Sequence, residues 1–248
     1  MTPCVVVQPN HPATPTGHPL AEIVRGAADG HFPAVDGGWT RLPAWRPGTG
    51  AVVAFTGHAY ICGAPGVPDA TLTALGVDGF GGASHPAVLT ALAGPGGWVD
   101  CLDALLVCRG RAPAGPTPLV PRPDLALVPR PDLALVPRPD LANHPRAVHA
   151  RHTRDEVVVW GYPDREREDV ATVGRGLAGL TQVGVEASAP GTRSTLVADL
   201  LASLPPDELV LAGVAPGNAR SARSLFRAGF EIIGSVQLFA NDPTGRTA

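Results

Sequence analysis

Few residues of this sequence could carry out chemistry through a familiar local arrangement. The cysteines form no C-x-x-C pair, and their spacing fits no zinc site, so we expect reduced thiols and no metal ion. They are Cys4, Cys62, Cys101 and Cys108. No G-x-S-x-G sequence occurs, which excludes a serine nucleophile elbow. The glycine-rich stretch 76–82 lacks the lysine of a phosphate-binding loop and is interpreted as a turn.

One histidine stands where sites often form. His58 follows the apolar stretch 51–55 after Thr56 and Gly57, and this stretch is expected to be a buried strand. Binding sites of α/β sheets often lie at the carboxyl ends of strands. His58 could therefore bind a substrate or act as a base. A structural role is the alternative, because a lone histidine after a strand more often has one.

The second half of the chain has an ordered series of elements that must position any site. Residues 171–178 and 180–188 are expected to form a hairpin, and Leu196, Leu200 and Leu204 mark one face of a helix at 192–204. The other expected elements are strands at 156–161, 208–214 and 230–239 and helices at 145–152 and 219–228. This series predicts a mixed α/β sheet.

The first half predicts a smaller α/β region. Its expected elements are a helix at 18–30, a strand at 51–55, short helices at 68–75 and 85–92, and a strand at 102–108.

From about Val157 to Phe239 the sequence resembles the GNAT superfamily of N-acyltransferases. The resemblance rests on the element order and on Ala215-Pro-Gly-Asn218 followed by Ala228-Gly-Phe230. It is closest to a group of actinobacterial GNAT-like proteins with a divergent pyrophosphate loop. The further shared motifs are Phe55-Thr-Gly-His58, Gly174-Arg-Gly-Leu-Ala-Gly179 and Val214-Ala-Pro-Gly-Asn-Ala219.

The resemblance implies a GNAT-like mixed sheet in which two parallel strands, 180–188 and 208–214, splay apart to admit acetyl-CoA as cosubstrate. Splayed strands expose backbone groups to the pantetheine arm, and the following helix offers free N–H groups to the pyrophosphate. The residues that this places against acetyl-CoA are Val185, Gly191, Thr192, Arg193, Ser194 and Asn218. Asn218 can alternatively be an ordinary helix N-cap.

The same resemblance makes Glu186 the candidate general base, because many members place a catalytic carboxylate on this strand. Two family features are absent. Leu196 stands where the pyrophosphate loop has a glycine, and Leu225 stands where many members have a tyrosine acid. Water, Ser221 or Ser224 would then protonate the leaving thiolate.

An octapeptide, Leu-Val-Pro-Arg-Pro-Asp-Leu-Ala, occurs at 119–126, 127–134 and 135–142 without change. Its prolines exclude a helix interior and a central strand and favour extended, polyproline-like chain. We interpret it as a linker; a Pro-rich ligand for another protein is the alternative. The expected organisation is an N-terminal α/β region at 1–112, the linker at 113–142 and an acyl-CoA-binding domain at 143–248.

The composition excludes several classes of partner. The net charge of -3 gives no basic excess, so we expect no nucleic-acid and no membrane partner. No signal peptide is evident, which favours the cytoplasm. The leading hypothesis is an enzyme that transfers an acetyl group to a small-molecule or peptide amine by direct attack. The alternative is an inactive acyl-CoA-binding or protein-interaction module. The sequence leaves the acceptor and the oligomeric state open.

Overall fold

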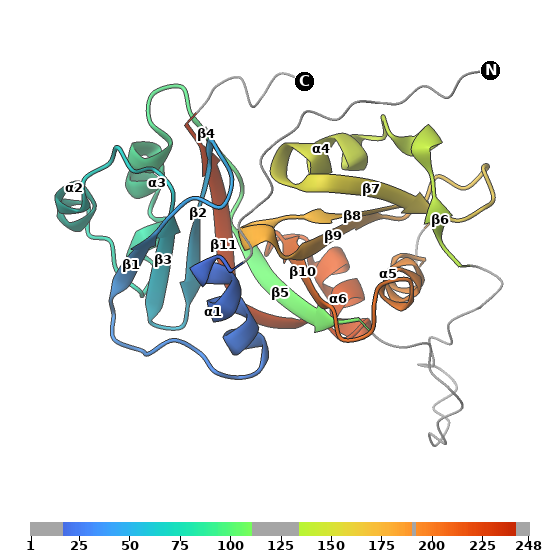
Figure 1. The fold of residues 1–248 in the computed structure, drawn as a ribbon, viewed down its shortest axis with the longest axis horizontal. Coiled ribbons are helices and arrows are strands. Elements are labelled where there is room, and N and C mark those ends of the chain that lie inside the picture. The colour runs from blue at the N-terminus through green and yellow to red at the C-terminus, as the bar shows by residue number, and fades with distance from the viewer. Residues whose placement is uncertain (1–16, 111–133, 190–191, 242–248) are drawn as a thin grey trace.

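A computed structural model describes residues 17–110, 134–189 and 192–241 of the chain (Figure 1). The helices are α1 (Pro19–Ala28), α2 (Asp69–Ala74), α3 (Pro86–Ala93), α4 (Pro145–Thr153), α5 (Arg193–Ala202) and α6 (Ala219–Arg227). The strands are β1 (Trp39–Leu42), β2 (Thr49–Phe55), β3 (His58–Cys62), β4 (Trp98–Val99), β5 (Asp103–Arg109), β6 (Val136–Pro137), β7 (Asp155–Gly161), β8 (Val170–Arg175), β9 (Thr181–Glu186), β10 (Leu209–Val214) and β11 (Glu231–Ala240).

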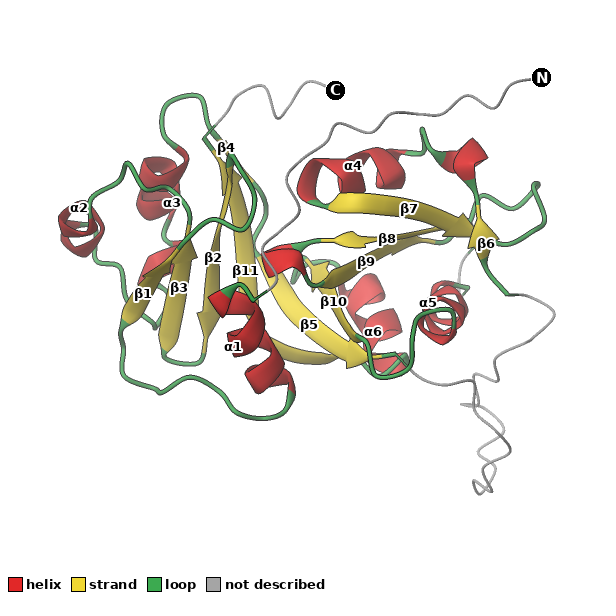
Figure 2. Cartoon of the chain, viewed as in Figure 1, coloured by secondary structure: helices red, strands yellow, loops and turns green. Residues whose placement is uncertain are grey.

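All of these strands belong to one sheet, in the order β1-β3-β2-β11-β5-β10-β9-β8-β7-β6, with β4 paired to β11. Parallel and antiparallel pairs both occur, so the predicted mixed α/β sheet is confirmed. Strand β5 of the first half lies between β10 and β11 of the second half and is antiparallel to both. Strands of the two halves are therefore interleaved at the centre of the sheet, where β11 lies between β2 and β5 (Figure 2). The division at residues 112 and 142 stays a prediction.

Strands β9 and β10 are parallel neighbours that separate after two residue pairs. Thr181 pairs with Val210 and Gln182 with Leu211, and the pairing ends there. On their outer sides the pairing continues, because β9 stays paired with β8 as far as Glu186 and β10 with β5 as far as Val214. The inner edges of both strands are therefore open at their carboxyl ends. The predicted splayed pair is confirmed, with α5 as the connection between the two strands.

Helices cover both faces of the sheet in its second half (Figure 1). Apolar residues of α5 and α6, such as Leu200 and Leu225, pack with Val183 of β9 and Val210 of β10. Helix α4 packs on the opposite face, where Ala147 contacts Val159 and Val170. Any ligand that enters between β9 and β10 is therefore bounded by α5 and α6 on one face and α4 on the other.

The third octapeptide packs against the sheet, which differs from the extended linker that the sequence predicted. Leu135 is buried in the core beside α5, and Val136 and Pro137 form an edge strand on β7. Arg138 is only 4% exposed. It binds the carboxylate of Asp140 and donates to the carbonyl oxygen of Tyr162 at 2.7 Å. The first octapeptide and all but the last residue of the second lie outside the described residues.

Three strands of the first half, β1, β3 and β4, were not predicted. Residues 56–57 form a tight turn in which Gly57 has a φ of 80°, and β3 returns along β2 from His58 onward. β1 then pairs in parallel with β3. His58 is therefore the first residue of a strand rather than part of the loop that ends one. In the described ranges, no helix combines the length and apolar character that a membrane crossing requires.

Candidate functional site

The opening between β9 and β10 leads into a cavity of about 260 Å³ that reaches both faces of the sheet. On the α5 and α6 face, the lining residues include Val183, Val185, Arg193, Ala212, Val214, Asn218, Ser221 and Leu225. On the α4 face, they include Trp45, Asp100, Cys101, Asp103, Arg146, His149, Arg154, Gln182, Gly184 and Gly213. The cavity therefore connects the predicted acetyl-CoA side with a second chamber rich in charged side chains.

Three of the predicted acetyl-CoA residues line the cavity, namely Val185, Arg193 and Asn218. Arg193 is the first residue of α5 and donates from Nη1 to the Ser221 hydroxyl at 3.2 Å. Its Nε is buried and has no hydrogen-bond partner in the described part of the chain. A phosphate or another anion would supply that partner, so the group that the resemblance implies fits this end of the cavity.

The other described residues predicted for this loop, Thr192 and Ser194, are not among those that line the cavity. Thr192 precedes α5 and donates its hydroxyl to the carbonyl oxygen of Ala189 at 2.9 Å, without capping the helix. Ser194 lies in the first turn of α5 and is not among the residues that line the cavity. Gly191 lies outside the described residues. Asn218 caps α6, since its side-chain oxygen accepts from the Ser221 amide at 3.1 Å, and it lines the cavity as well.

Leu225 lines the cavity at the position where many GNAT enzymes carry a tyrosine. Neither tyrosine of the chain replaces it. The Tyr162 hydroxyl donates to Asp199 at 2.7 Å inside the core, and burial followed by this bond raises the pKa of Tyr162. Tyr60 belongs to β3 in the first half. Of the two serines considered from the sequence, Ser221 lines the cavity, whereas Ser224 is buried and donates to the Arg220 carbonyl.

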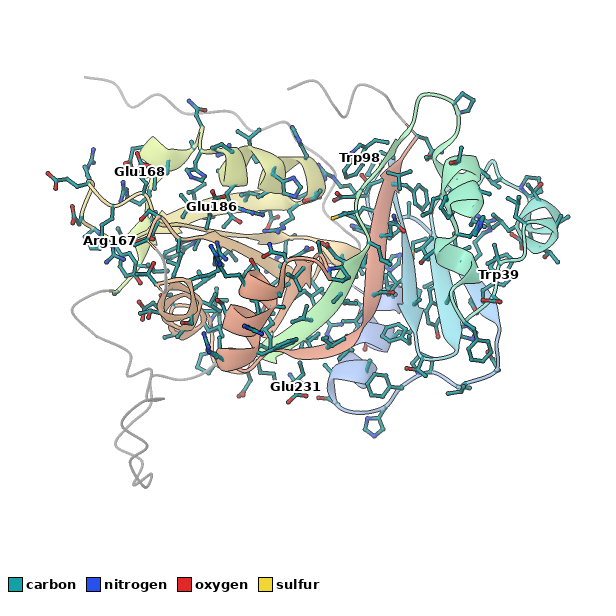
Figure 3. The ribbon with its side chains drawn as sticks, turned by 180° about the vertical axis from the view of Figure 1, so that it is seen from behind. Trp39, Trp98, Arg167, Glu168, Glu186 and Glu231 are labelled. Carbon is teal, nitrogen blue, oxygen red and sulfur yellow. The ribbon has the colours of Figure 1, made fainter. Side chains whose placement is uncertain are left out.

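Glu186, the predicted base, lies at the end of β9 on the side of α4 (Figure 3). Its side chain is 46% exposed, and Oε2 lies 3.5 Å from Nε of Arg146. This is an ion-pair distance, but the alignment does not make a hydrogen bond. Glu186 is not among the residues that line the cavity. Its role as base stays a prediction.

His58 is held on both sides by hydrogen bonds in the first half of the chain. Its Nδ1 lies 2.8 Å from the carboxylate of Asp36, and its Nε2 lies 3.0 Å from the hydroxyl of Thr40. The hydrogen bond to His58 lowers the pKa of Asp36. His58 does not line the cavity. The structure therefore does not bring His58 together with the predicted acetyl-CoA residues.

A carboxylate that the sequence did not single out reaches the cavity from β5. Asp103 leans over Gly213 of β10, where an added Cβ would lie 2.6 Å from its Oδ2. It accepts a hydrogen bond from the Cys101 thiol at 3.2 Å. Burial, reinforced by the neighbouring Asp100, raises the pKa of Asp103. A carboxylate with a raised pKa at the edge of the splay can take a proton from a bound amine.

A buried arginine occupies the matching position over β9. The guanidinium of Arg154 lies over Gly184, where an added Cβ would be 3.2 Å from Nη2. Burial, together with Arg146, lowers the pKa of Arg154 to about 10, so it stays charged at neutral pH. The glycines of the two splayed strands thus leave room for two side chains of opposite charge, Asp103 over Gly213 and Arg154 over Gly184.

Sequence reasoning missed Asp103, His149 and Arg154 because their partners are far away in the chain. The only local signal is a glycine in each splayed strand, Gly184 and Gly213, where a β-strand would otherwise place a side chain. Which side chain fills each space depends on how β5 and α4 fold back over the sheet. In the described residues, no cluster of three or more histidine, cysteine, aspartate or glutamate side chains could hold a metal ion.

Comparisons with known proteins add little to this geometry. No family model matches the sequence, and no curated protein matches it. A putative acetyltransferase of the GNAT family from Novosphingobium aromaticivorans has a TM-score of 0.34 and 17% identity, covering 60% of this chain and 69% of that one. A GCN5-related N-acetyltransferase from Kribbella flavida has a TM-score of 0.36 and 15% identity, covering 62% of this chain and 63% of that one. Both TM-scores are below 0.5, so the two structures share only a loose likeness with this chain.

Proposed function

We propose that this chain transfers an acetyl group from acetyl-CoA to the amine of an acceptor. The observation that carries the proposal is the cavity between β9 and β10, which joins Arg193 and Asn218 on one face to Asp103 on the other. A transferase of this kind needs its cosubstrate and its acceptor to meet inside the sheet, and the open inner edges of β9 and β10 provide the passage.

The α5 side would hold the cosubstrate. Arg193 and the first turn of α5 face the phosphates, with Nε of Arg193 available as a donor. The open backbone groups of Val183–Glu186 and Ala212–Val214 can pair with the amides of the pantetheine arm, as a third strand would. Acetyl-CoA supplies the activated acetyl group, and the remaining steps belong to side chains of this chain.

Asp103 is the carboxylate that the geometry supports best as proton acceptor. It lines the cavity and has a raised pKa, whereas Glu186 lies outside the lining and next to Arg146. As the amine nitrogen bonds to the acetyl carbon, its proton passes to Asp103 and the carbon–sulfur bond breaks. Ser221 lies on the α6 side of the cavity. Its hydroxyl, which accepts from Arg193, can donate a hydrogen bond to the leaving thiolate, which takes its proton from water.

A covalent route through Cys101 is disfavoured. Desolvation, its hydrogen bond to Asp103 and the charges of Asp103 and Asp100 raise the pKa of the Cys101 thiol to about 12. Almost no thiolate is then present at neutral pH, and the thiolate is the nucleophilic form. Direct attack by the acceptor amine is therefore the proposed route.

The test combines calorimetry with acetyl-CoA and a free-thiol assay against a panel of amines. Binding with turnover supports the proposal. Binding without turnover across a broad panel would favour an acyl-CoA-binding module that has lost transfer activity. If acetyl-CoA does not bind, both the transferase and the acyl-CoA-binding module are excluded.

A further inference from the structure

Three arginines that line the cavity each have a buried Nε without a hydrogen bond, although Nε of Arg146 lies at ion-pair distance from Glu186. In the part of the chain that the structure describes, the buried side-chain nitrogen and oxygen atoms that lack a hydrogen bond are Nε of Arg146, Arg154 and Arg193. All three residues line the same cavity. Arg193 belongs to the proposed acetyl-CoA side. Arg146 and Arg154 belong to the opposite chamber, where the acceptor would lie.

Arg154 is the strongest of these signals. It is 7% exposed, and Nη1 donates to the Thr172 hydroxyl at 3.1 Å. No described carboxylate lies within ion-pair distance of its guanidinium. A buried cation with no counter-ion is costly, and proteins keep such groups where a bound anion completes them. The chamber is therefore built to receive an anion at Arg154.

The opposite wall of the same chamber carries negative charge. Asp103 lies over Gly213, and Asp100 lines the cavity beside it. An amine without a carboxylate would leave Arg154 unpaired, whereas an acid without an amine would leave the carboxylates unpaired. A ligand that carries one positive and one negative group can pair with the carboxylates on one wall and with Arg154 on the other.

The size of the chamber limits the ligand further. The whole cavity has a volume of about 260 Å³ and must also receive the thioester end of acetyl-CoA. Sites for larger, drug-sized ligands usually have about 300–1,000 Å³. Apolar side chains, including Trp45, Leu177 and Leu238, complete the lining. A small ligand with an apolar portion fits this space better than a peptide or an aminoglycoside.

We propose that the acceptor is a free amino acid, with its carboxylate on the guanidinium of Arg154 and its amino group facing Asp103. This inference rests on the proposed function and names its substrate class. The ammonium first passes one proton to Asp103, which frees the lone pair of the nitrogen. The nitrogen then bonds to the acetyl carbon as the carbon–sulfur bond breaks, and its second proton passes through water to the leaving coenzyme A thiolate. The product is an N-acetylamino acid. It has lost the positive charge that Asp103 recognises, which favours its release.

The test compares each proteinogenic amino acid with its carboxamide as acceptor, using acetyl-CoA and release of free thiol. The carboxamide keeps the amine and the side chain but lacks the carboxylate. We expect kcat/KM for the preferred amino acid to exceed that of its amide about 10- to 100-fold, since a charge-assisted contact is lost. Arg154→Met should abolish this preference. Arg151→Met, on the exposed side of α4, is the matched control and should keep it.

Thermal melts show whether Arg154→Met is folded, so that a lost preference cannot be due to unfolding. Methionine removes a buried charge without a counter-ion, so Arg154→Met should have an unchanged or higher Tm. The carboxylate that binds Arg154 could instead belong to the acyl group of the cosubstrate. Assays with succinyl-CoA, whose acyl group carries a carboxylate, test this alternative. Preference for succinyl-CoA with simple amines would assign Arg154 to the acyl group and overturn the inference.

Equal turnover of amino acids and amides would also overturn the inference and leave the proposed transferase intact. Turnover of simple amines without turnover of any amino acid would likewise overturn the inference and leave the proposed transferase intact. Acetyl-CoA binding without turnover of any acceptor would overturn it too. Failure of the chain to bind acetyl-CoA would instead remove the proposed function, and the inference with it.

Discussion

The carboxylate of Asp103 lies over Gly213, close enough that a Cβ on residue 213 would lie 2.6 Å from its Oδ2. This contact joins β5, which comes from the first half of the chain, to the splayed strand β10 of the second half. The proposed base, Asp103, is therefore supplied by a strand that lies outside residues 157–239, the segment that resembles the GNAT superfamily.

The first prediction concerns which carboxylate accepts the proton. Asp103→Asn keeps the shape and the acceptor oxygen for Cys101 but cannot take a proton at neutral pH. We expect it to lower kcat about 100-fold or more with acetyl-CoA affinity nearly unchanged. Glu186→Gln is the matched variant on β9 and should have a much smaller effect, measured by the same thiol-release assay. The reverse ranking would restore Glu186 as the base.

The second prediction concerns stability and pH at the same residue. The pKa of Asp103 is raised in the folded state, so the native chain binds its proton more tightly than the unfolded chain does. The wild type should therefore lose stability as pH rises from the ordinary aspartate value toward the raised one. Asp103→Asn lacks this loss and should be more stable than wild type at neutral pH, with the gain shrinking in acid. Denaturant melts at several pH values measure it, and a constant difference across pH would contradict it.

The third prediction concerns the cosubstrate end of the cavity. Arg193→Ala removes the unpartnered Nε and the charge at the start of α5. We expect acetyl-CoA affinity to fall about 10- to 100-fold by calorimetry, with less effect on kcat at saturation. Arg223→Ala, which removes an exposed arginine of α6, controls for general charge and should leave the affinity unchanged. Equal losses in the two variants would show that only overall charge matters.

The fourth prediction concerns the octapeptide repeat. Arg138 donates to the carbonyl oxygens of Tyr162, Asp164 and Arg167. Arg138→Ala should therefore lower the free energy of unfolding by about 2 kcal/mol or more, since several buried bonds are lost together. Arg130→Ala changes the same position of the preceding, identical octapeptide and is the matched control. Equal effects of the two variants in denaturant melts would indicate that the octapeptides exchange places at the edge of β7.

Removal of one octapeptide tests the linker interpretation in the same way. Because the units are identical, deletion of any one yields the same sequence. We expect a stability change of about 1 kcal/mol or less, because loop-closure entropy varies slowly with length. A loss of several kcal/mol would show that more than one unit packs against the folded chain.

The second half was predictable from sequence because its signals are local. Apolar periodicity placed β9, α5 and β10, and Asn218 marks the start of α6 through a capping bond that forms in the structure. The first half was harder. Gly57 permits the turn that begins β3, but the same residues also fitted a loop that carries His58. The third octapeptide was read from its prolines alone. The burial of Leu135 and Arg138 depends on partners in α5 and in the loop after β7, which no local pattern records.

The site was predictable only on its cosubstrate side. Arg193 and Asn218 follow from motif positions on adjacent elements, and both line the cavity. The acceptor side is assembled from β5, α4 and Arg154, which lies between α4 and β7. The insertion of β5 between β10 and β11 has no signature in composition or spacing. Asp103 and Arg154 could therefore be recognised only after the strand order was known.

The central claim is that the opening between β9 and β10 receives acetyl-CoA, and calorimetric titration of wild type and Val185→Trp tests it most directly. Val185 lines the cavity on the open edge of β9, so a tryptophan there should fill the passage without touching α4. The account predicts binding of one acetyl-CoA per chain by wild type and loss of that binding in Val185→Trp, with both proteins folded by thermal melt. No binding by wild type, or equal binding by the two proteins, would contradict it.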